Sequence, residues 1–180
     1  MPHPMLKRAL LATMLGATLV ACDGGSGPGA ANGARLGIDG DTSAWQMERG
    51  DAGFRKHGVA TGLLLRAKDG ARSVELTGTF LGEPDAPVFV SLGVSYDDGE
   101  GLVFQRAAPL STDGQGAEGV TWESLSLDHE AGEGRAEVTL DIPVCADHYT
   151  GPTEFTTRCH QLEGRFDVAL VRDPALRILQ

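Results

Sequence analysis

Apolar and polar side chains alternate along much of the chain, which is the pattern of half-buried β-strands and not of helices. The clearest alternation occupies residues 74–80, 88–96, 136–144 and 162–170. Weaker alternation occurs at residues 35–38, 58–67, 102–107 and 120–128. Each segment has the length of a single strand, with side chains at every second position on one face of a sheet.

Glycine, aspartate and proline separate these segments in short clusters at residues 68–70, 82–85, 97–101, 112–114 and 132–134. Short strands joined by Asp-Gly turns, each with one wet face, are typical of antiparallel sheets. The pattern predicts an all-β domain, with an antiparallel β-sandwich of about seven or eight strands as the first choice. An up-and-down, lipocalin-like barrel is the alternative, and such a barrel could hold a small ligand.

The first 22 residues have a different pattern. Lys7 and Arg8 precede an apolar run at residues 9–21, and the run ends in Leu-Val-Ala followed by Cys22. A permanent membrane helix needs about 20 apolar residues, so this run has the length of a signal-peptide core instead.

The Leu-Val-Ala-Cys ending resembles the lipobox of bacterial lipoproteins, and the resemblance covers residues 1–22 only. It implies that residues 1–21 are removed as a signal peptide. It also implies that Cys22 carries a diacylglyceryl group and further fatty acid such as palmitate. Two or three chains on one cysteine would anchor the protein stably. We therefore expect an envelope lipoprotein, fixed to the inner or outer membrane with its domain outside the cytoplasm.

Residues 22–34 are glycine-rich and small, which predicts a flexible tether between the lipid and the domain. A coil of this length spans on the order of 20 Å. Residues 35–180 are then one domain of ordinary size. The chain carries 15 basic and 25 acidic residues. This acidic balance argues against binding nucleic acid or anionic headgroups by net charge alone.

Two cysteines remain after Cys22, and an even pair in an oxidising compartment predicts a disulfide between Cys145 and Cys159. Strand parity places both on the outward-facing side of the last two strong segments. A metal pair with His148 and His160 is the alternative, but its spacing matches no common zinc arrangement.

The disulfide would close a loop of residues 146–158, which is longer than most hairpin turns. We predict this loop to be a partner-binding surface, with candidate residues His148, Tyr149, Glu154, Phe155 and Arg158. Long loops with aromatic and hydrogen-bonding side chains are common recognition surfaces. Equally, Tyr149 and Phe155 could fold back and cap the open end of the sandwich.

Motifs for a serine hydrolase elbow, a zinc protease, a phosphate-binding loop and a dinucleotide cofactor are absent from the sequence,. We therefore predict no catalytic residue, no metal and no cofactor. The favoured function is a membrane-anchored domain that binds another envelope protein, for example as an inhibitor or immunity protein. A lipocalin-like carrier of a small ligand is the alternative, and an envelope hydrolase is a further one.

Overall fold

The computed structural model describes residues 33–176 except 49, 113, 115 and 152–153, and the side chains of residues 148–155 are also left out. The described chain is all-β. Its ten strands are β1 (Gly33–Ile38), β2 (Asp41–Gln46), β3 (Ala52–His57), β4 (Ala60–Asp69), β5 (Arg72–Leu81), β6 (Val88–Asp97), β7 (Val103–Ala107), β8 (Val120–Asp128), β9 (Glu133–Gly151) and β10 (Glu154–Arg172).

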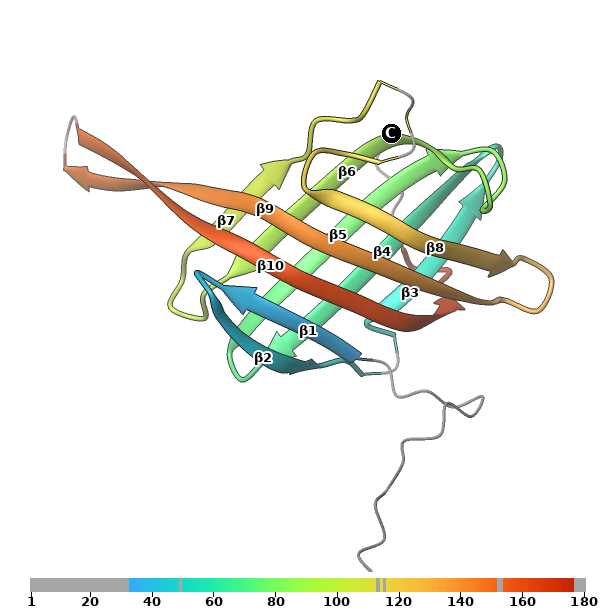
Figure 1. The fold of residues 1–180 in the computed structure, drawn as a ribbon, viewed down its shortest axis with the longest axis horizontal. Coiled ribbons are helices and arrows are strands. Elements are labelled where there is room, and N and C mark those ends of the chain that lie inside the picture. Colours follow the sequence, from blue (N-terminus) through green and yellow to red (C-terminus); the bar gives the residue numbers. More distant parts are fainter. Residues whose placement is uncertain (1–32, 49, 113, 115, 152–153, 177–180) are drawn as a thin grey trace, which may run out of the picture.

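The ten strands form one hydrogen-bonded sheet that folds back into two layers (Figure 1). One layer has the order β2-β1-β10-β9-β8, and the other has the order β3-β4-β5-β6-β7. The layers are joined where Arg172 pairs with Phe54 in parallel and where Gln105 pairs with Cys145. They are also joined where Gln46 of β2 pairs with Lys68 of β4. The fold is therefore a sandwich whose layers are joined at three places, which gives it a barrel-like closure.

Large apolar side chains fill the space between the layers. Five phenylalanines are fully or almost fully buried there, at positions Phe54, Phe80, Phe89, Phe104 and Phe166. Four of the five come from the β3–β7 layer, and Phe166 comes from β10. Burial of this much aromatic surface is a main source of stability for such a domain.

The structure has more strands than predicted, because β2 and β3 were not expected. Each of these six-residue strands buries a single large side chain, Trp45 in β2 and Phe54 in β3. One apolar residue does not make an alternating pattern, so the sequence carried no signal for them.

The alternation at residues 88–96 predicts that Val88 and Val90 share the buried face of Leu92, and this prediction is wrong at the start of β6. Val88 and Val90 are 47% and 49% exposed, whereas Phe89 is 2% exposed. The pairing of β5 with β6 shifts between Thr79 and Phe80, so that Val90 is an extra residue in the ladder. Such a bulge reverses which alternate residues face the core.

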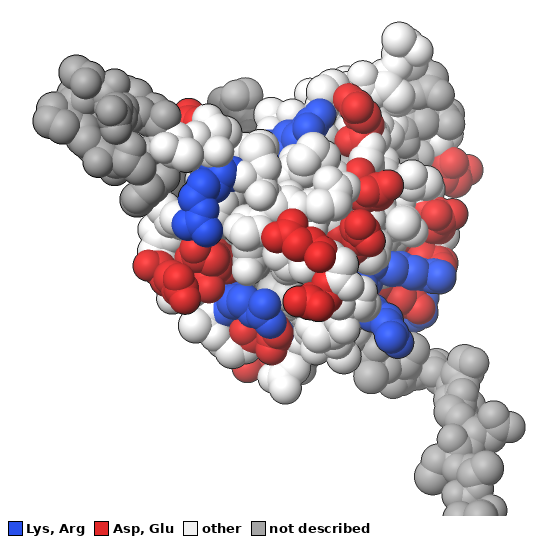
Figure 2. Space-filling model, turned by 60° about the vertical axis from the view of Figure 1, so that its left-hand side comes forward, with Lys and Arg blue, Asp and Glu red and all other residues white. Residues whose placement is uncertain are grey.

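Positive and negative side chains are interspersed on the face shown in Figure 2, where blue patches adjoin red ones. The described ion pairs include Arg66 with Glu75, Arg106 with Glu118 and Arg135 with Asp167. Pairs at the surface each contribute little to stability. Their consequence is that many of the described positive side chains are already balanced locally by a carboxylate.

Candidate functional site

The candidate site is the outer part of the β9–β10 hairpin, which projects from the body of the sandwich (Figure 1). Both strands have 19 residues. On its outer edge β9 pairs with β8 as far as Leu140 and with β7 at Cys145, and β10 pairs with β1 through residues 162–167. We call residues 146–151 and 154–158 the arm. Within the described residues, the arm's two strands pair only with each other.

The arm corrects the prediction of a long loop over residues 146–158. The strands continue past the disulfide, with Arg158 opposite Ala146 and Phe155 opposite Tyr149. Threonine and aromatic residues, which favour strands, are frequent in this segment. Residues 152–153, between the two strands in the sequence, lie outside the described residues.

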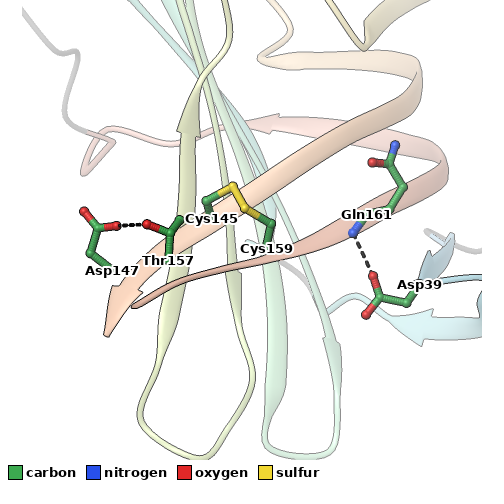
Figure 3. The surroundings of a disulfide bond; sticks show 6 residues. All are labelled: Asp39, Cys145, Asp147, Thr157, Cys159 and Gln161. Atoms are coloured by element: carbon green, nitrogen blue, oxygen red, sulfur yellow. Dashed lines mark hydrogen bonds between the residues drawn. A yellow bond between two sulfur atoms is a disulfide. The ribbon is translucent and has the colours of Figure 1, made fainter. Parts of the chain in front are cut away.

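The disulfide between Cys145 and Cys159 confirms the sequence prediction. The two residues lie directly opposite each other in the ladder, with Cα atoms 4.1 Å apart and sulfurs bonded at 2.07 Å. Figure 3 shows the bond at the base of the arm, with the Thr157 hydroxyl donating to the Asp147 carboxylate at 2.7 Å. The covalent bond and the side-chain contact hold the two strands in one register as they leave the body.

His160 connects the base of the arm to the body. Its ring meets Phe104 and Tyr96 edge on, with centroids 4.5 and 5.6 Å away. Its Nδ1 lies 2.6 Å from Oδ2 of Asp39, and the backbone N–H of Gln161 donates to Oδ1 of Asp39 at 2.8 Å (Figure 3 shows the Gln161 contact). Strand parity alone predicts that His160 faces inward together with Leu162, but no sequence signal joins His160 to Asp39.

Asp39 is placed by a tight turn between β1 and β2. Asp39 and Gly40 have φ angles of 53° and 90°, as in the two-residue Asp-Gly hairpin turn,. The hydrogen bond with His160, followed by that from the Gln161 backbone, lowers the pKa of Asp39 below its usual value,. The turn thus presents an ionised carboxylate to the first residues of β10 below the arm.

The arm's free edges determine what it can do. A strand edge without a neighbour presents backbone N–H and C=O groups that can pair with a strand of another protein.

Of the five candidate residues, Arg158 is exposed. Arg158 lies near enough to Asp98 to help lower the pKa of that carboxyl, after hydrogen bonds from the Glu100 and Leu102 backbone. The side chains of His148, Tyr149, Glu154 and Phe155 lie outside the described residues.

The lipidation prediction at Cys22 and the tether also fall outside the described residues, except for its last two positions, where Gly33 and Ala34 begin β1. Within the described part of the chain, no helix has the length and apolar character to cross a membrane.

Comparisons of the chain with protein-family models, with curated proteins and with solved structures gave no match.

Proposed function

We propose that this protein is a lipid-anchored envelope domain that binds another envelope protein through the arm. The observation that carries the proposal is a disulfide-clamped hairpin. In its arm, the two strands pair with each other and with no other strand among the described residues. Inhibitors and immunity-type lipoproteins are the class we favour, because they need an anchor, a tether and a binding surface but no catalytic centre.

The mode of binding that fits this geometry is strand addition. A partner strand would pair along one edge of the arm, where backbone hydrogen bonds supply affinity and alternate side chains supply specificity. Holding the two strands in register before binding reduces the conformational entropy lost in the complex. The clamp at Cys145 and Cys159 therefore favours tighter binding than a free loop of the same sequence would give.

The small-ligand carrier is supported less well by the interior of the sandwich. A carrier needs space between its layers for the ligand. Large side chains such as Phe80, Phe89 and Phe166 occupy that space and are at most 2% exposed. We therefore retain the protein-binding function as the conclusion.

The experiment is photo-crosslinking in living cells of the organism that makes the protein. A benzoylphenylalanine residue would replace Tyr149 or Phe155 in the arm of the full chain, and Val103 in the body as a matched control. Val103 is 46% exposed and lies on β7. We expect one envelope protein to be captured from the arm positions and not from position 103.

A second variant tests whether the arm itself is needed. Residues 147–157 would be replaced by a three-residue glycine-serine linker, which keeps the Cys145–Cys159 pair. The captured protein should no longer copurify with this variant. The proposal is wrong if arm and body positions capture the same set of proteins, or if copurification survives loss of the arm.

A further inference from the structure

A hollow of about 290 Å³ lies at the end of the sandwich where β10 joins β3. It is lined by Arg55, Lys56, His129, Arg172 and Pro174. Arg55 and Lys56 are on β3, Arg172 ends β10, and His129 follows β8 in the turn to β9. Residues more than 100 positions apart thus place three fixed positive charges and one imidazole around a single opening.

These charges differ from most of the other positive charges that the structure describes. Most described arginines and lysines form an ion pair with a carboxylate, namely Arg66, Lys68, Arg72, Arg106, Arg135 and Arg165. Arg55, Lys56 and Arg172 form none with the described carboxylates. In an acidic protein, three unpaired positive charges around one hollow create a local site for an anion.

Backbone and ring contacts hold three of the groups in place. Arg172 lies against Gly132, where an added Cβ would come within 3.3 Å of the Arg172 Cβ and 3.6 Å of its Nε. The His129 ring packs edge on against Phe54, with centroids 5.5 Å apart. Arg55 donates one hydrogen bond to the Leu176 carbonyl at 3.0 Å, which leaves other guanidinium donors for a ligand,.

Two carboxylates lie near His129 and oppose an anion there. The Asp128 carboxylate already accepts hydrogen bonds at 2.8 Å from the backbone N–H groups of Glu130 and Ala131. Glu83 raises the pKa of His129, but burial and then Lys56 outweigh it, so that the pKa of His129 is lowered overall. Among the neighbouring charges, Lys56 and Arg172 lower the pKa of His129, and Glu83 and Asp128 raise it by less.

We propose that this hollow binds a phosphate group through Lys56, Arg172 and the remaining donors of Arg55, with the His129 ring N–H as an additional donor. Arginine and lysine around one opening are the usual ligands of phosphate oxygens. The phosphate could belong to a lipid headgroup or to a soluble phosphoester. Gly33 pairs with Asp167, so the tether enters the domain about 17 Å along β10 from Arg172,. This proposal is independent of the arm, and only its lipid source rests on the proposed anchor.

The test is a titration of the full chain in neutral detergent with inorganic phosphate at constant ionic strength. The ring signal of His129 is followed by NMR and assigned with His129→Gln. We expect a saturable shift. Lys56→Gln should weaken the affinity by about fivefold or more, because a charge-assisted contact is lost. Glu83→Gln should strengthen it by about twofold, because a nearby negative charge is removed.

Arg35→Gln is the matched control, since Arg35 is an exposed cation on β1 without an ion pair to a described carboxylate. It should leave the affinity within about twofold, as expected for a distant screened charge.

A second titration uses short-chain phosphatidylglycerol below its micelle concentration, with phosphatidylcholine as the comparison lipid. Tighter binding of phosphatidylglycerol than of inorganic phosphate identifies a lipid headgroup, and the reverse identifies a soluble phosphoester. A shift that does not saturate, or an equal loss with Arg35→Gln, overturns the proposal.

Discussion

At the scale of single residues, the contact between His160 and Asp39 joins the arm to the body. His160 packs its ring on Phe104 and Tyr96 and places Nδ1 2.6 Å from the Asp39 carboxylate. The backbone N–H of Gln161 donates to the same carboxylate. Both contacts favour the ionised form of Asp39, so the base of the arm is held most firmly when this group is charged.

Asp39→Asn should therefore destabilise the protein in a pH-dependent way. Asparagine tolerates the positive φ of this position, so the turn is kept,. Because the pKa of Asp39 is lowered on folding, its contribution is complete above its usual pKa of 3.8 and is lost as the pH falls through the lowered value,. The Asp39 side chain is 55% exposed, so we expect a loss of only about 0.5–1 kcal/mol at neutral pH,.

Urea unfolding of both proteins between about pH 6 and about pH 2 checks this expectation. The difference between them should shrink toward zero at the acid end. A difference that is the same at every pH would show that the substitution acts through the turn and not through the carboxylate.

At the scale of elements, β10 organises its layer because it pairs with β9 on one edge and with β1 and β3 in turn on the other. Gly164 allows β1 to lie close. Its φ is +132°, and an added Cβ would meet the Arg35 carbonyl oxygen and come within 2.8 Å of the Leu36 Cα. The approach involves backbone atoms, which cannot move aside as a flexible side chain can.

Gly164→Ala should accordingly cost about 3 kcal/mol of folding free energy, from the forced backbone conformation and the contact with β1. Gly93→Ala is the control, because its added Cβ would meet only the Thr77 side chain, at 3.2 Å. Thermal unfolding measures both, and hydrogen exchange should show the loss concentrated in β1 and β2. Equal effects of the two substitutions would contradict the role assigned to Gly164.

At the scale of the whole molecule, the protein combines an acidic surface, one basic hollow and a projecting arm. The formal net charge of the full chain is −10 at neutral pH. Such a surface is repelled by anionic membranes, so net charge does not hold the domain at the bilayer. A covalent lipid on Cys22 would hold it there regardless of charge.

Cys22→Ser should move the protein from the membrane fraction to the soluble fraction, or arrest it with the residue 1–21 segment uncleaved. Fractionation and intact-mass measurement of both proteins distinguish these results. Membrane association of the serine variant at the same mass as the wild type would refute the lipoprotein assignment.

The sequence by itself determined which residues form strands and which of their faces are buried where apolar residues alternate, except at the bulged start of β6. It predicted an all-β domain, the inward set from Ala136 to Val144 and the Cys145–Cys159 disulfide, and all three are confirmed. The physical reason is that side chains alternate between the two faces of a strand, so burial is recorded locally in the chain.

Only the tertiary structure decided how the strands pair. The closure of β10 on β3, the bulge at Val90 and the projection of the arm depend on which distant strands are neighbours. The same is true of the basic hollow, where Lys56 and Arg172 meet. Alternation along a strand indicates which face of the sheet a side chain lies on, but not which strand pairs with it. Register and layer closure are set by contacts between remote parts of the chain.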